Sequence, residues 1–432
     1  MIILALISAA AASVDPTCDS DAYCAKNFND NYYCEMSSKI CRRIPVYQNL
    51  ETYSIIGLVL NFLFSILASS IGVSSGGMVY CFLIFCMQLT TKDTIPILKV
   101  GNLFASAINI VFILRKRREE NQDELYIDWS LAAYCIPFVL AGCMIGMLAH
   151  EFFPGAYLLG LMFLTLIIFA SMTWKESMRL EAEEESKGET NLTVKTWGRN
   201  TNTGADFLKT LTIVEHKTLL EIIKENFVSI LVMCAATLIM IIGNLIKGSP
   251  TFKSVIGLHA CTPLAFACYL VACLVTASTS YLVKSRVEIN YSNYTQIKIA
   301  IISFISGVLI SVGITGSLAF SSFLVVSGIE PLVVAALSAF MLFFTSIATI
   351  IQFLVIGYLD IPNSVFIGLF ALAGSIIGNV VMSRSLGKSL GAQSIIPYIL
   401  FIVLILTIII MPFSAIQEYY NNPDFFNYGV IC

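Results

Sequence analysis

Twelve apolar segments, separated by short polar stretches, dominate the chain. Most contain the roughly 17–25 residues that an α-helix needs to cross a hydrocarbon layer of about 30 Å. Such unbroken runs predict helices, because the strands of a membrane barrel alternate apolar and polar residues over about 10 positions. The pattern predicts an all-α polytopic membrane protein. The segments are 53–71, 77–89, 96–114, 129–149, 155–174, 226–246, 260–283, 298–314, 317–328, 331–356, 362–382 and 395–412.

Two of these segments are too short to cross a bilayer. Segment 77–89 has 13 residues and segment 317–328 has 12. At 1.5 Å per residue, either helix would be roughly 20 Å long. Both segments follow a Gly/Ser-rich stretch, so we expect them to be half-helices that begin within the membrane.

The start of the chain predicts a signal peptide and a small luminal cap. Residues 1–13 are apolar and end in small residues, which is typical of a secretory signal peptide. Four cysteines in residues 14–51 then predict two disulfides in an oxidising compartment, with three pairings open. A zinc site is less favoured, because this part has no CxxC pair and no histidine. We expect a stapled cap, with a small binding module as the alternative; the cysteines are Cys18, Cys24, Cys34 and Cys41.

The basic residues predict the orientation. If the cap is outside, 17 of the 25 Lys and Arg residues lie in inside loops or at the adjoining start of a helix, as the positive-inside rule expects. The predicted order is a first membrane half over 52–174, a charged cytosolic loop over 175–225, a second membrane half over 226–412 and an outside tail over 413–432. We expect a multi-pass protein of the secretory pathway, in the plasma membrane or an endomembrane.

Composition excludes several function classes. Charged residues are 12% of the chain, against about 25% in soluble proteins, and the net charge is −3. A soluble enzyme and a nucleic-acid partner are therefore not expected. No metalloprotease, hydrolase or nucleotide-binding motif is present, so the sequence predicts neither an enzyme nor a cofactor.

The two halves share one layout. In each, a helix ends in a Gly/Ser-rich break, and a short apolar segment, a polar turn and a long helix beginning at or near a proline follow. On the predicted orientation the halves enter from opposite sides, so we expect an inverted repeat. Paired Gly-interrupted short segments are the best sequence indication of a transporter's binding site. The candidate residues at the two breaks are Gly72, Ser74, Ser75, Gly76, Gly77, Gly313, Thr315, Gly316 and Ser317.

The start of a half-helix offers unpaired N–H groups and the positive end of its dipole, which together favour an anion. The alternative is that these glycines only permit close helix packing. Lys99, three residues into its segment, is either a cation facing the anion path or a lysine that snorkels to the outer surface. We expect Asp93, Glu330 and Asp360 to cap helices or lie in solvent, with a role in proton coupling as the alternative, and His150 to lie at the surface. Asn102 and Ser338, near the starts of the two long helices, complete the candidate site.

Several motifs resemble the sulfite exporter TauE/SafE family. Gly328-Ile-Glu-Pro331 and the following Ala335–Met341 are similar to a family stretch in the second half, and Lys99–Asn109 is similar to a stretch of its eukaryotic members. The resemblance covers roughly residues 52–412 without the 175–225 loop. It departs from the family where Ser74, Ser75, Thr315 and Ser317 replace glycines. The resemblance implies transport of sulfite, sulfonates or other small anions.

The sequence leads to a hypothesis and an alternative. The first is a secondary transporter of a small anionic solute within the lipid bilayer, in which a proton or ion gradient would drive uphill movement because no ATP-binding motif is present. The alternative is a non-transporting receptor or scaffold that acts through its cysteine-rich cap.

Overall fold

The computed structural model describes residues 20, 32–35, 40–48, 50–70, 76–114, 127–195, 219–248, 254–255, 257, 262–284, 293–313, 316–386, 395–421 and 426. The predicted signal peptide and the positions Cys18 and Cys24 lie outside this part of the chain.

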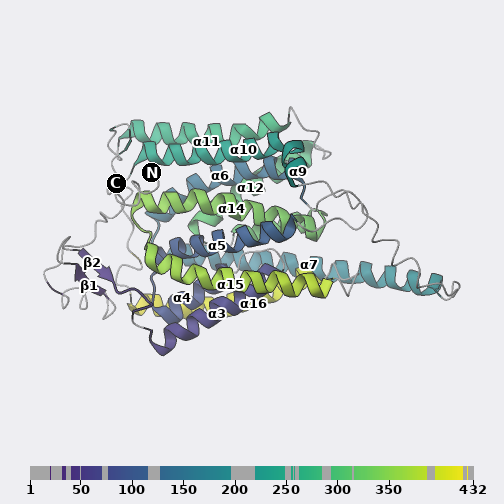
Figure 1. Ribbon diagram of the computed structural model, residues 1–432, viewed down its shortest axis with the longest axis horizontal. Coiled ribbons are helices and arrows are strands. Elements are labelled where there is room, and N and C mark those ends of the chain that lie inside the picture. Colours follow the sequence, from purple (N-terminus) through teal and green to yellow (C-terminus); the bar gives the residue numbers. More distant parts are fainter. Residues whose placement is uncertain are drawn as a thin grey trace.

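The described chain forms ten helices that are long and apolar enough to cross a membrane, which run side by side along the long axis of the molecule (Figure 1). Two shorter apolar helices, α4 (Gly76–Met87) and α13 (Gly316–Val326), fall where the sequence predicts half-helices. The polytopic helical fold is therefore confirmed. The long helices are α3 (Thr52–Ser70), α5 (Thr91–Ile113), α6 (Trp129–Phe152), α7 (Gly155–Lys195), α10 (Phe227–Lys247), α11 (Pro263–Lys284), α12 (Asn293–Val312), α14 (Pro331–Ile356), α15 (Ile361–Leu386) and α16 (Ile395–Asn421).

Two helices extend beyond their predicted apolar segments. Helix α7 continues to Lys195, into the stretch expected to be a loop, and projects past the other helices (Figure 1). Glu and Lys are good helix formers, so this charged stretch can prolong a helix that the membrane segment has already nucleated. Helix α16 continues past Pro412 to Asn421, so much of the expected outside tail is helical. A short helix, α9 (Leu219–Glu225), precedes α10.

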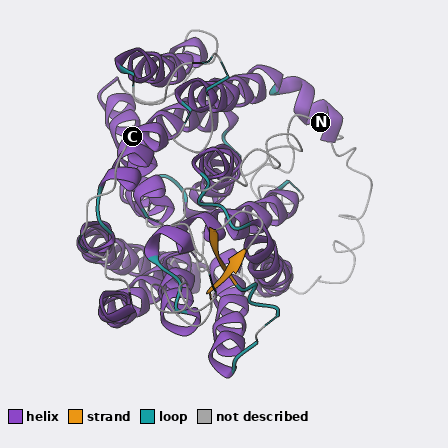
Figure 2. Ribbon diagram, turned by 90° about the vertical axis from the view of Figure 1, so that its left-hand side faces the viewer, coloured by secondary structure: helices purple, strands orange, loops and turns teal. Residues whose placement is uncertain are grey.

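The cap is not helical. Strands β1 (Tyr32–Glu35) and β2 (Ile40–Arg43) form an antiparallel hairpin in which Cys34 faces Cys41. The hairpin lies at one end of the helix bundle (Figures 1 and 2). Just after it, the buried Val46 donates its N–H to Asn363 Oδ1 at 2.8 Å, which docks the segment onto the start of α15. The pairing of the four cysteines stays a prediction.

Glycines allow two pairs of helices from different halves to pack backbone to backbone. A β-carbon on Gly142 would lie 2.0 Å from the Phe304 carbonyl oxygen, and one on Gly146 would lie 2.4 Å from that of Val308. These contacts advance in the same direction, so α6 and α12 run parallel. Such contact is impossible for a larger residue and follows the small-xxx-small rule of membrane helices.

Helices α3 and α15 repeat this arrangement. Gly374 lies against the Phe62 carbonyl, and Gly378 lies against that of Ile66, so these two helices also run parallel. The short helices also pack on helices from the other part of the chain: α4 packs on α16, and α13 packs on α7. The helix before each break and the short helix after it, α3 with α4 and α12 with α13, therefore pack on helices from the other part of the chain, α15 with α16 and α6 with α7.

Candidate functional site

The first break joins two antiparallel helices, α3 and α4. Near the start of α3, a β-carbon on Gly57 would lie 3.1 Å from Cys86 Cβ at the end of α4. Further along, the Phe64 and Phe82 rings stack with their centroids 5.2 Å apart. The chain thus enters the bundle along α3 and returns along α4, so that α4 begins deep in the bundle and ends near the level at which α3 begins.

The second break has the same shape. Lys298, near the start of α12, places its Nζ 5.3 Å from the centroid of the Phe323 ring near the end of α13. At the other end, Gly316 packs so tightly on α12 that a β-carbon would lie 2.3 Å from the Ser306 carbonyl oxygen. Helix α13 therefore also begins at depth, and only glycine fits at its first position.

The first turns of the two short helices meet. A β-carbon on Gly77 of α4 would lie 3.7 Å from Leu318 Cδ1 of α13 and 3.5 Å from Thr407 Cγ2 of α16. Gly77 and Leu318 are both almost completely buried. The sequence places these residues 241 positions apart, and the fold brings them so close that a methyl group on Gly77 would be in van der Waals contact with Leu318.

Lys99 lies beside the second break and does not reach the outer surface. Only 2% of the residue is exposed, and its Nζ donates to the Ile310 carbonyl at 2.6 Å, with the Gly313 carbonyl at 3.5 Å. A cation is favoured at the C-terminus of a helix, and these carbonyls form the end of α12. No carboxylate forms an ion pair with Lys99 in the described part of the chain. The snorkelling alternative is therefore wrong.

Buried hydroxyls surround the start of α13. Ser321 donates to the Ser317 carbonyl at 2.9 Å and shares a 2.8 Å hydrogen bond with the Ser338 hydroxyl of α14. The Ser317 Oγ itself is fully buried and has no hydrogen-bond partner among the described residues. A buried hydroxyl without a partner is costly, so Ser317 has spare capacity to bind a polar group.

The remaining predicted residues divide into two groups. Gly76, Gly77, Gly313, Gly316 and Ser317 lie at the two breaks, whereas Lys99 and Asn102 of α5 and Ser338 of α14 are buried on the long helices that follow the short ones. Gly72, Ser74, Ser75 and Thr315 lie outside the described residues. Sequence reasoning missed Thr407 and Ser321, because neither position carries a motif; Thr407 reaches the site only through the packing of α16 on α4.

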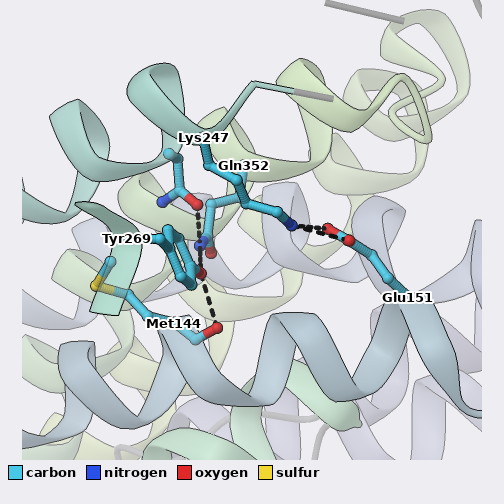
Figure 3. Close-up of polar contacts among 6 residues, drawn as sticks. Met144, Glu151, Lys247, Tyr269 and Gln352 are labelled. Atoms are coloured by element: carbon cyan, nitrogen blue, oxygen red, sulfur yellow. Dashed lines mark hydrogen bonds and ion pairs between the residues drawn. The ribbon is translucent and has the colours of Figure 1, made fainter. Parts of the chain in front are cut away.

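A second buried polar cluster joins α10 and α11 to α6 and α14 (Figure 3). Lys247 donates to both carboxylate oxygens of Glu151 at 3.0 and 2.9 Å. Gln352 donates to Asn244 Oδ1 at 2.8 Å, and the Tyr269 hydroxyl donates to the Met144 carbonyl at 2.7 Å. Gln352 is therefore buried in the interior of the bundle.

Two further expectations have clear outcomes. Asp360 caps α15 by accepting the backbone N–H of Asn363 at 3.3 Å, and it also accepts from the Asn363 side chain at 2.6 Å, as expected for a turn carboxylate. His150, expected at the surface, is instead completely buried. The sequence does not predict this burial, because His150 follows the end of an apolar segment. Its burial there depends on contacts with other segments, Phe353 and Tyr358 among them. Nowhere in the described residues do three or more His, Cys, Asp or Glu residues gather in a way that could hold a metal ion.

These features define a polytopic helical membrane protein with two inward-pointing helix breaks that meet beside a buried cation. The family model for "Sulfite exporter TauE/SafE" matches residues 35–198. The resemblance of this chain to the sulfite exporter TauE/SafE family is thereby confirmed, and the relatives below extend it over most of the chain.

Three relatives from Arabidopsis thaliana are similar over most of their length. Sulfite exporter TauE/SafE family protein 1 is 22% identical over 394 residues, which cover 85% of either chain. Family protein 5 is 23% identical and aligns over 84% of this chain and 83% of its own. Family protein 6 is 25% identical and aligns over 69% of this chain and 68% of its own. No solved structure gives a significant match.

Proposed function

We propose that this protein is a secondary transporter of a small oxyanion of the sulfite or organosulfonate class, with its binding site where the two short helices meet. The observation that carries the proposal is the close approach of Gly77 to Leu318, which leaves room for about one methyl group, near the second break where Lys99 is buried. Two helix N-termini and one ammonium group bring positive potential to one place within the membrane. The printed names of the relatives indicate the substrate class.

We also propose that the two halves form an inverted repeat. The contacts of α5 with α15, Gly101 to Ala371 and Asn109 to Asn379, advance together, so α5 runs in the same direction as α3 and α15. Cys143 of α6 lies near Lys99 of α5, and His150, later on α6, lies near Lys92, earlier on α5, so α6 returns. Helix α12 runs parallel to α6 and therefore opposite to α3. The two break-containing hairpins then enter from opposite faces.

This arrangement supports alternating access. Because α4 packs on α16 and α13 packs on α7, each short helix is held by the long helix that ends the other half. If one hairpin moved together with its supporting helix, the place where α4 and α13 approach each other would open to one side of the membrane at a time. Other transporters built from inverted repeats alternate in this way.

Transport by purified protein in proteoliposomes tests the proposal. Labelled sulfite, a short organosulfonate and sulfate should be compared, with and without a pH gradient. We expect saturable flux of sulfite or the sulfonate, and loss of that flux in Lys99→Met but not in Lys298→Met, which removes an exposed lysine near the start of α12. Absence of flux of any of these anions through folded protein would overturn the proposal.

A further inference from the structure

His150 of α6 has unmet hydrogen-bonding capacity. The side chain is completely buried, and neither Nδ1 nor Nε2 has a hydrogen-bond partner among the described residues. Its ring instead meets the edges of two aromatic rings, Phe353 at 5.4 Å and Tyr358 at 6.5 Å between centroids. An imidazole carries at least one N–H in every protonation state, so this donor is unpaired at a depth where pairing matters.

The charges around His150 are mainly positive. Lys92 and Lys99, both on α5, lie within electrostatic range of its ring. The neighbouring carboxylate, Glu151, is already paired with Lys247 of α10. Near the start of α5, Glu418 is occupied by the backbone N–H and the hydroxyl of Thr91. Both of these carboxylates are thus bound to other groups, while Lys99 has no carboxylate partner among the described residues.

The position of His150 connects it to the two helix breaks. Met147, one turn earlier on α6, and Phe353, which contacts the His150 ring, belong to the same apolar cluster as Val79 of α4 and Leu318 of α13. Lys92 and Lys99 are seven residues apart on α5, or about 10 Å along the helix. His150 therefore lies between the start of α5 and the place where the two breaks approach each other.

We propose that His150 is a ligand of the transported anion, donating a ring N–H to it on the cap-side branch of the path, with Lys92 and Lys99 supplying the attracting charge. An oxyanion with several acceptor oxygens, such as a sulfite or sulfonate group, could bind an imidazole donor and an ammonium group together. This inference rests on the proposed function. It adds to the anion site a residue, His150, that the sequence predicted to lie at the surface.

The test compares His150→Phe with His150→Gln in the full-length protein. Phenylalanine keeps a flat ring among aromatic neighbours but removes both donors, whereas glutamine keeps an N–H. We expect His150→Phe to fold with unchanged or higher thermal stability, and to raise KM for sulfite or the sulfonate about tenfold or more. His150→Gln should keep KM within about threefold of the wild type. Phe353→Leu, which alters the packing of the same ring without removing the imidazole, should leave KM nearly unchanged.

The outcomes separate this inference from the proposed function. If the wild type transports the anion and His150→Phe has the wild-type KM, the inference is wrong and the proposed function stands. If Phe353→Leu raises KM as much as His150→Phe does, His150 acts only through packing, which also overturns the inference. If the wild type neither transports these anions nor is stabilised by them in a thermal-shift assay, both proposals fail.

Discussion

Lys247, the last residue of α10, donates to both carboxylate oxygens of Glu151 near the end of α6, at 3.0 and 2.9 Å. Both side chains are less than one-tenth exposed. The Nζ of Lys247 also lies 5.5 Å from the centroid of the Tyr269 ring. The pair therefore ties the α10–α11 helices to the core of the bundle.

Replacing one residue of this pair should destabilise the protein more than replacing both. Lys247→Met leaves Glu151 buried without a counter-charge, and we expect a loss of about 3–5 kcal/mol. The double variant Glu151→Gln with Lys247→Met should recover much of that loss, because no charge remains unpaired. Thermal unfolding in detergent measures the coupling. Additive losses in the double variant would show that the two residues do not act as a pair.

Replacing Lys99 should affect transport more strongly than folding. Its ammonium group lies beside the second break and forms no ion pair with a described carboxylate. Lys99→Met should therefore lower kcat/KM about 30-fold or more. The exposed Lys298, replaced in the same way, should change it little. The comparison uses initial rates in proteoliposomes at equal amounts of inserted protein. Equal rates for the two variants would exclude Lys99 from the anion path.

Two glycines at the starts of the short helices should respond differently to alanine. At Gly316 the new methyl group would collide with the backbone of α12, and we expect a loss of about 1–3 kcal/mol or a displaced helix. At Gly77 the nearest atom is 3.5 Å away, so Gly77→Ala should fold and gain about 0.5–1 kcal/mol from helix propensity.

The same pair of variants also probes the site. Because the Gly77 methyl group would point at Leu318 and Thr407, transport should fall in Gly77→Ala although the protein is stable. Thermal stability and sulfite flux are to be measured on the same preparations. Wild-type flux in Gly77→Ala would show that the anion does not pass between these residues.

The cap should loosen when Asn363 is changed. Asn363→Ala removes the acceptor of the buried Val46 N–H, and an unpaired buried donor costs about 1–3 kcal/mol. Limited proteolysis should then cut the segment after the hairpin faster than in the wild type. Asn379→Ala, which removes a hydrogen bond to Asn109 far from the cap, serves as the control. Equal cleavage in both variants would argue against docking through Asn363.

The sequence alone determined the elements of the fold. Hydrophobic length distinguishes a spanning helix from a half-helix, so the residues of segments 77–89 and 317–328 are enough to identify both as too short to span. The Gly/Ser breaks and the lysine at position 99 stand out in the sequence as well, since a glycine-rich break and an intramembrane charge are rare enough to carry information.

Only the tertiary structure decided which of these elements meet. The bond from Lys99 to Ile310 spans 211 positions of the sequence, and the burial of His150 depends on Phe353 and Tyr358 of another part of the chain. The pairing of Glu151 with Lys247 likewise requires α10 to lie against α6. Local patterns fix helices through backbone hydrogen bonds within one segment, whereas helix partners are chosen by side-chain shape across segments, as Gly142 and Gly374 illustrate.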